Sequence, residues 1–296
     1  MTYYLGALGA LAALPDPEAG LSLTPERIGL SHQLLSGAKV RDTIGYSRQW
    51  QLSWTAITLA QYGLLEGFYY GATGGGPYYF VDDEQTNLLP LNVSTGTDAT
   101  GDTTGFLQVN GATIASQVQG ATLWNTLGGP FPANGSRTLV TTVPNAFANN
   151  QIPVIVSADV PVVGGVSYTF SVYLRSASTN VIGAYGQINW RDASLSTITT
   201  NSGNTITPAA QIGRSTVTAV SPTTAVSARL QYLITPANTS GSSQFIYTDG
   251  WQFEMNSSAS TWQPGVAVPL VTVESLSRST PLAGICDAQM TLVQVG

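Results

Sequence analysis

The sequence is poor in the residues that most often mark a chemical site. Its 296 residues include one cysteine, Cys286, one histidine, His32, and one lysine, Lys39. A single cysteine excludes a disulfide within the chain, and a single histidine excludes a metal site built on several imidazoles. A Ser-His-Asp triad would have to use His32, but its neighbour Ser31 points to the opposite face of an expected strand. We therefore interpret His32 as a structural, hydrogen-bonded residue.

Charge is also scarce. Only 9% of the residues are charged, and 10 basic against 16 acidic residues leave a net charge of -6. This argues against recognition of nucleic acid, which needs a basic surface to meet phosphates. No hydrophobic run approaches the ~20 residues that cross a bilayer, so no membrane insertion is expected. The apolar run from Tyr3 to Leu14 has no basic residue before it, which predicts a buried segment rather than a signal peptide.

What the chain has in quantity is short runs of alternating apolar and polar residues, concentrated in residues 91–265. Many short strands separated by turn-forming clusters, with almost no helical pattern, predict a jelly-roll β-sandwich. The expected strands are 137–143, 153–160, 167–175, 182–190, 214–220, 227–234 and 244–255. The Thr-, Ser- and Gly-rich stretch 92–105 before them predicts a linker.

The first 90 residues follow a different pattern. Residues 48–54 alternate, with two tryptophans on one face, which predicts a half-buried strand. Thr58 and Gln61 fit a capping box, and apolar residues at helical spacing follow to about Tyr70, so an amphipathic helix is expected. Another strand is expected over residues 78–81, and the polar segment 36–46 predicts a hairpin.

Residues 266–296 carry two further strand patterns, 268–276 and 287–295. Two strands alone cannot bury an apolar face, so we expect them to pair with the first 90 residues. A split hub domain, residues 1–90 and 266–296, would then carry residues 91–265 as an insertion. The expected fold class is mainly β: a hub with one helix plus an inserted jelly-roll β-sandwich.

The acidic residues do not suggest catalysis. Glycoside hydrolysis needs two carboxyl groups that flank one sugar bond. Asp249 and Glu254 lie five residues apart on one expected strand, so in an unbroken strand they point to opposite faces. The sequence therefore predicts that the protein is not an enzyme.

One expected surface has a composition that suits sugars. On three strands of the middle domain the apolar residues have one parity, and tyrosine, amide and guanidinium groups have the other. Aromatic faces stack on sugar rings, while amides and guanidinium groups bind hydroxyls. If the strands share a sheet, its outer face is a candidate glycan site, although the same face also suits solvent or a neighbouring subunit. The candidates are Tyr173, Arg175, Tyr185, Gln187, Asn189, Arg191, Arg229 and Gln231.

Short motifs follow one another in a distinctive order through the first segment. They include Gly29-Leu30-Ser31-His32, Arg48-Gln49-Trp50, Gly76-Pro77-Tyr78-Tyr79-Phe80-Val81-Asp82 and Asn87-Leu88-Leu89-Pro90. In this order they resemble the start of minor tail proteins of siphophages of actinobacteria, namely the hub part of a distal tail protein. The resemblance implies a tail-tube-like β-sandwich hub that forms a ring, usually a hexamer, between the tail tube and the tail tip or baseplate.

The end of the middle domain carries a second resemblance. Residues 249–254 and 261–265 (Asp-Gly-Trp-Gln-Phe-Glu and Thr-Trp-Gln-Pro-Gly) resemble the closing strand of carbohydrate-binding-module jelly rolls found in phage tails. Such jelly rolls often hold a structural calcium ion through backbone oxygens and a carboxylate that Asp249 matches. Asp98 and Asp102 would add oxygen ligands. The alternative is a plain turn without a metal, and no other cofactor is expected.

Together the resemblances imply a virion protein, made in the host cytoplasm without a signal peptide and placed in the tail. Its partners would be further copies of itself, the tail-tube protein and tail-tip or baseplate proteins. The inserted domain would project outward, where it could touch host cell-surface glycans. The alternative function is that of a carbohydrate-binding adsorption protein of the tail tip.

Subunit contacts are expected where charges of opposite sign lie on separate edges of the hub. Such charges steer copies into one register. The candidate contact residues are Lys39, Arg41 and Asp42 of the hairpin, and Asp82, Asp83 and Glu84 after the last hub strand of the first segment.

Overall fold

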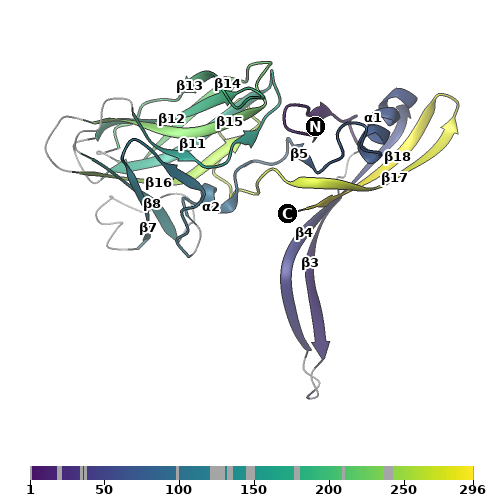
Figure 1. Cartoon of the computed structure of the whole chain (residues 1–296), viewed down its shortest axis with the longest axis horizontal. Coiled ribbons are helices and arrows are strands. Elements are labelled where there is room, and N and C mark those ends of the chain that lie inside the picture. The colour runs from purple at the N-terminus through teal and green to yellow at the C-terminus, as the bar shows by residue number, and fades with distance from the viewer. Residues whose placement is uncertain are drawn as a thin grey trace. The chain divides into compact units, whose positions relative to one another are not determined.

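Figure 1 shows the computed structural model of the chain. It describes residues 2–18, 22–33, 36, 39–97, 100–120, 131, 136–144, 151–176, 181–208, 211–236 and 243–295, and only the backbone of residues 26–32, 39–46, 182 and 236. Strands predominate, so the fold is mainly β, as predicted. The chain divides into two compact units: unit 1 comprises Met1–Asp82 and Pro269–Gly296, and unit 2 comprises Asp83–Val268.

Unit 1 is built on one antiparallel sheet, whose described strands follow the order β2-β1-β5-β17-β18-β4-β3. The strands are β1 Tyr3–Gly6, β2 Ala12–Ala13, β3 Ser22–Gln33, β4 Lys39–Thr58, β5 Tyr78–Asp82, β17 Leu270–Leu282 and β18 Ile285–Gln294. β17 pairs with β5, and β18 pairs with β4. The expected pairing of the carboxyl-terminal strands with the first segment is therefore confirmed.

A helix, α1, forms the second layer of unit 1. It runs from Leu59 to Tyr69, and both bonds of the capping box between Thr58 and Gln61 are present, as predicted. Tyr62, Leu65 and Phe68 are buried in one cluster with the tryptophans of β4. Among the described residues the strands of unit 1 form a single sheet. The layer that the sandwich interpretation assigned to a second sheet is thus supplied by α1, because its apolar stripe covers the sheet. No helix of the described chain is long and apolar enough to cross a lipid bilayer.

β3 and β4 continue beyond the rest of the sheet as a two-stranded ribbon (Figure 1). β4 pairs with β18 only from Gln49 to Thr58, whereas from Lys39 to Arg48 its recorded partner is β3. At ~3.3 Å per residue the ribbon extends roughly 30 Å from the sheet. The segment that the sequence predicted as a short hairpin is the end of this longer structure.

Unit 2 is a β-sandwich of two antiparallel sheets. One follows the order β13-β12-β15-β9-β6, with β10 beside β15, and the other follows β14-β11-β16-β8-β7. The elements are α2 Leu91–Ser94, β6 Phe106–Gln108, β7 Thr113–Val118, β8 Arg137–Val143, β9 Gln151–Val156, β10 Val160–Pro161, β11 Ser167–Ser176, β12 Val181–Arg191, β13 Thr197–Ser202, β14 Gly213–Val220, β15 Ser227–Pro236 and β16 Gln244–Glu254.

The core of unit 2 lies between the two sheets. Phe170, Trp190, Leu230 and Tyr232 are fully buried there, together with Trp251. The expected parity of apolar and polar residues on β11, β12 and β15 is therefore confirmed.

Residues 92–105 are not a linker. Val93, Ser94 and Thr97 are buried. Gly96 has a φ of 75°, and a Cβ at this position would lie 2.9 Å from the Thr248 carbonyl oxygen. A composition typical of linkers here reflects close packing against β16, where small residues are required.

The chain enters and leaves unit 2 along adjacent segments. Val266 N donates to the Asn87 carbonyl at 3.2 Å, and Ala267 N donates to the Leu89 carbonyl at 2.9 Å. The buried Asn87 side chain donates to the Gln263 carbonyl at 2.9 Å. Because these pairs belong to unit 2, its limits lie at Asp83 and Val268, outside the expected 91–265.

Candidate functional site

The outer face of the five-stranded sheet of unit 2 is largely closed. Gln252 is fully buried, and its Nε2 donates to Ser260 Oγ at 2.7 Å and to Glu254 Oε1 at 2.9 Å. Arg214 donates to the Ser260 carbonyl at 2.7 Å and to Ser171 Oγ at 2.8 Å. The segment that follows β16 thus lies over this face and is tied to it by hydrogen bonds.

Asp249 and Glu254 lie on the same face of β16, so the expectation of opposite faces is wrong. Their cross-strand partners on β11 are Tyr173 and Thr169, which have the same parity. The cause is a β-bulge at Gly250, whose φ is 60°. A bulge adds one residue to a strand and shifts the alternation of all that follows.

Asp249 is fully buried. Its carboxylate accepts hydrogen bonds from Gly250 N at 2.7 Å and from Gln119 Nε2 at 2.5 Å. Burial raises the pKa of Asp249 to about 8, against the lowering effect of these two hydrogen bonds. Its partners are therefore protein donors.

The other two calcium candidates do not complete a site with Asp249. Asp98 lies outside the described residues. Asp102 accepts hydrogen bonds from Thr104 N at 2.9 Å and Thr104 Oγ1 at 2.7 Å. In the described part of the chain, no group of three or more His, Cys, Asp and Glu side chains is arranged to hold a metal ion.

The eight candidate glycan residues do not share one sheet. Tyr173 and Arg175 are on β11, which belongs to the five-stranded sheet, whereas the other six are on β12 and β15 of the six-stranded sheet. Tyr173 lies beneath the Arg214 guanidinium, 5.4 Å from its ring centroid. Arg175 is buried, donates to the Pro208 carbonyl at 2.6 Å, and has its pKa lowered by burial. These two residues therefore have structural roles and leave the glycan candidate.

The outer face of the six-stranded sheet brings the remaining candidates together in rows across strands. Gln187 pairs in register with Ser202 of β13 and with Gln231 of β15. Gln231 Nε2 donates to Gln187 Oε1 at 2.5 Å, and Gln187 Nε2 donates to Ser202 Oγ at 3.0 Å. The row continues into Ile155, the cross-strand partner of Gln231 on β9. Three strands thus present a connected line of amide and hydroxyl groups.

Asn189 and Tyr185 occupy the neighbouring rows. Asn189 pairs in register with Arg229, and its Oδ1 is buried with no hydrogen-bond partner among the described residues. Tyr185 pairs with Leu233, and partial burial raises its pKa. The face therefore combines an open acceptor, an aromatic ring and apolar side chains.

Asp159 is the residue that the sequence did not single out. It follows β9 and lies at the end of this face, where it binds both arginines of the candidate set. Arg191 Nη1 lies 2.5 Å from Asp159 Oδ2, and Arg229 Nε lies 2.7 Å from Asp159 Oδ1. Arg191 also donates to the Leu195 carbonyl. Asp159 falls outside the strand alternation, so only the excess of arginine on the neighbouring strands pointed to an acidic partner.

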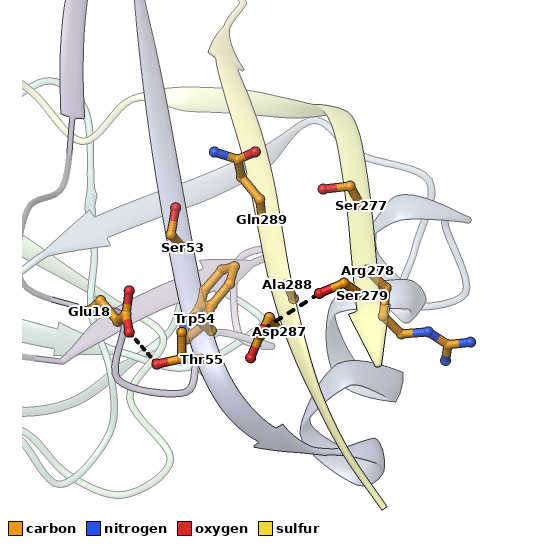
Figure 2. A pocket seen from close by; sticks show the side chains of 10 residues that line it. All are labelled: Glu18, Ser53, Trp54, Thr55, Ser277, Arg278, Ser279, Asp287, Ala288 and Gln289. Carbon is orange, nitrogen blue, oxygen red and sulfur yellow. Dashed lines mark hydrogen bonds between the residues drawn. The ribbon is translucent and has the colours of Figure 1, made fainter. Parts of the chain in front are cut away.

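A second polar site lies on the sheet of unit 1. A hollow of about 330 Å³ is lined by Glu18, Ser53, Trp54, Thr55, Ser277, Arg278, Ser279, Asp287, Ala288 and Gln289. Figure 2 shows that these side chains come from β4, β17 and β18 and from the segment before β3. The sequence gave no sign of this hollow, because its residues are scattered over the chain and meet only through strand pairing.

The expected subunit contacts are only partly described. Lys39, Arg41 and Asp42 lie at the far end of the ribbon, where the backbone alone is described. Asp82 is 5% exposed, so it cannot belong to an outer acidic surface of unit 1. Asp83 and Glu84 belong to unit 2.

No protein-family model and no curated protein matches the sequence. Among solved structures, the CBM22-1 xylan-binding domain of Paenibacillus barcinonensis Xyn10C is 14% identical and has a TM-score of 0.41, over 60% of this chain and 100% of that one. The enzymatically active domain of bacteriophage CBA120 tailspike protein 4 is 12% identical with a TM-score of 0.39, over 58% of this chain and 22% of that one. The Clostridium thermocellum xylanase 10B modules give 13%, 0.38, 58% and 28%. This chain therefore spans about a quarter of the length of the last two proteins, and similarity of this degree assigns no activity.

Proposed function

We propose that unit 2 is a carbohydrate-binding domain and that the glycan binds on the outer face of its six-stranded sheet. The observation that carries this proposal is the row from Ser202 through Gln187 to Gln231, with Asn189 Oδ1 left open beside it. Amide groups both donate and accept, which matches the hydroxyls of a sugar. Tyr185, Ile155 and Leu233 add the apolar surface on which sugar rings pack.

The charges of this face favour a neutral glycan. Asp159 holds both Arg191 and Arg229 in ion pairs. A second anion would have to displace a carboxylate that is already well placed, whereas a hydroxyl needs only the free donors and acceptors. Binding of uncharged polysaccharides is therefore expected to exceed that of anionic ones.

Binding rather than catalysis suits the acidic residues of unit 2. Asp249 is buried, and Glu254 accepts hydrogen bonds from Gln252 and Ser260 on the closed face. Asp159 is committed to two arginines. None of these carboxyl groups stands opposite another across an open surface, which is the arrangement that glycoside hydrolysis needs.

The test is a polysaccharide panel, with neutral and anionic members, against the full chain by affinity electrophoresis. Gln187→Met with Gln231→Met keeps the side-chain length and removes the amides, so binding should weaken at least tenfold, on the order of two lost hydrogen bonds. Gln117→Met, an exposed glutamine on β7 of the other sheet, is the matched control. Unchanged binding by the double variant, or no binding to any member of the panel, would refute the proposal.

We propose further that unit 1 is an assembly module of a phage tail, a ring subunit that contacts copies of itself, the tail tube and the tip or baseplate. The specific observation in favour is the β3–β4 ribbon, which leaves the sheet with no other recorded strand beside it. A two-stranded ribbon is marginally stable in water and gains stability when another surface covers it. Light scattering over a concentration series should give a mass above that of one chain. A protein that stays monomeric throughout would contradict this function.

A further inference from the structure

We propose that the hollow on the sheet of unit 1 receives the basic end of the β3–β4 ribbon of a second copy of this chain. This inference rests on the proposed assembly function and names the surface through which the copies join. Its parts are the two carboxylates of the hollow, Glu18 and Asp287, and the basic residues Lys39 and Arg41 at the far end of the ribbon.

Both carboxylates are held in place by the fold. Glu18 N donates to the Ser53 carbonyl at 2.9 Å, and the Glu18 carboxylate accepts a hydrogen bond from Thr55 Oγ1. Asp287 Oδ1 accepts a hydrogen bond from Ala56 N at 2.9 Å, and Ser279 Oγ lies 3.5 Å from Asp287 Oδ2. Each carboxylate has about four acceptor sites, so both retain acceptors for another donor.

The position of Asp287 depends on a strained residue. Ala56 has a φ of 54°, in the left-handed region that favours glycine, at a register shift between β4 and β18. Such a conformation costs roughly 1 kcal/mol and persists only where the surroundings impose it. Here it directs the Ala56 amide to Asp287 and fixes the carboxylate at the hollow.

Neither carboxylate is neutralised within the described part of the chain. The ion pairs recorded there are those of Asp159 in unit 2. Arg278 lines the hollow, but its guanidinium lies over the Tyr62 ring, 4.9 Å from the centroid. Figure 2 shows that it points away from Glu18 and Asp287. A hollow with two positioned negative charges and several hydroxyls therefore suits a cationic side chain.

The ribbon supplies such side chains but cannot bring them to its own hollow. Lys39 and Arg41 pair in register with Gln33 and Ser31 near the turn of the ribbon. Ser53, which lines the hollow, lies on the same strand, fourteen residues after Lys39 (53 minus 39). At ~3.3 Å per residue this separates the two by roughly 45 Å along one strand. The basic end must therefore meet the hollow of another copy.

A contact between two different surfaces of the same chain is heterologous, and it closes into a ring or continues as a filament. The charge test uses variants that preserve the hydrogen bonds of the hollow. Glu18→Gln with Asp287→Asn should raise the self-association constant for dissociation about tenfold, the effect expected for close interfacial charge pairs. Glu274→Gln with Glu66→Gln, which removes two charges of unit 1 outside the lining of the hollow, should leave association unchanged.

A charge exchange gives the decisive comparison. Lys39→Glu with Arg41→Glu should weaken association, and adding Glu18→Lys to that variant should restore it in part, while Glu18→Lys alone weakens it. Analytical ultracentrifugation measures all four proteins, and circular dichroism verifies that each is folded.

The outcomes separate this inference from the proposed function. If the chain associates but neither set of variants changes the constant, the ribbon-and-hollow contact is wrong and assembly through another surface stands. If the chain stays monomeric at every concentration, both fall. Cross-linking between Lys39→Cys and Ser279→Cys variants mixed as separate proteins should yield a mixed dimer, and its absence from an associating sample would overturn the contact.

Discussion

Asp249 is the residue whose ionisation most affects stability. Burial raises its pKa to about 8 from an ordinary value of 3.8. Between these values the folded chain keeps a proton that the unfolded chain has released. The stabilising contribution of this proton is therefore complete below about pH 4 and is lost as the pH rises through about 8.

We accordingly predict that the free energy of unfolding falls between pH 4 and pH 8, by at most about 1.4 kcal/mol per pH unit from this residue. Asp249→Asn removes the titration and should flatten the profile measured by urea denaturation. Asp192→Asn, in the turn after β12, should leave the slope of the profile as it is in the parent chain. Profiles of equal slope for the parent and Asp249→Asn would show that the buried carboxyl does not hold its proton.

At this scale the sequence predicted the identity of the core residues but not the faces of the polar ones at Gly250. Alternation places Phe170, Trp190 and Tyr232 correctly, because an unbroken strand has a strict period of two. The bulge at Gly250 resets that period and puts Asp249 on the face of Glu254. A glycine inside a strand pattern was the available signal, since bulges often need its φ.

Among the elements, α1 has the clearest local code. Thr58 Oγ1 accepts from Gln61 N at 3.2 Å, and Gln61 Oε1 accepts from Thr58 N at 2.9 Å. Thr58→Ala should lower the free energy of unfolding of unit 1 by about 1 kcal/mol, since two amide donors lose their partner arrangement. Thr113→Ala, on the exposed edge strand β7, is the control. Chemical denaturation that finds the two variants equal would deny the cap this role.

β11 is the element whose packing joins the two sheets of unit 2. A Cβ on Gly186 of β12 would lie 2.9 Å from the ring of Phe170, so this ring fills the space above the glycine. Phe170→Ala should therefore cost roughly 3–5 kcal/mol. Phe245→Ala, at a site 45% exposed, should cost much less. Similar melting temperatures for the two variants would contradict the packing described.

The sequence predicted the existence of elements better than their partners. Strong alternation identified β8, β11, β12, β14, β15 and β16, whereas β6, β7 and β13 lack it and were missed. Sheet membership was wrong for β11, because two strands that follow each other with the same parity can face each other across a core as readily as lie side by side. The glycan candidate lost Tyr173 and Arg175 for this reason.

For the whole molecule, the division into two units has a direct experimental consequence. Both sheets of unit 2 are formed within Asp83–Val268. Residues 83–268 alone should therefore fold, with a cooperative thermal transition and the near-ultraviolet circular dichroism of packed tryptophans. A fragment with secondary structure but no near-ultraviolet signal would show that unit 2 depends on unit 1.

The two backbone segments through which the chain enters and leaves unit 2 also have a mechanical meaning. They are joined by the pairs Asn87–Val266 and Leu89–Ala267. A tension applied to a bound glycan would be divided between two covalent connections instead of one, and the hydrogen bonds between them would keep the strain out of the sandwich. One cut by a protease in either connection would leave the domain tethered by the other.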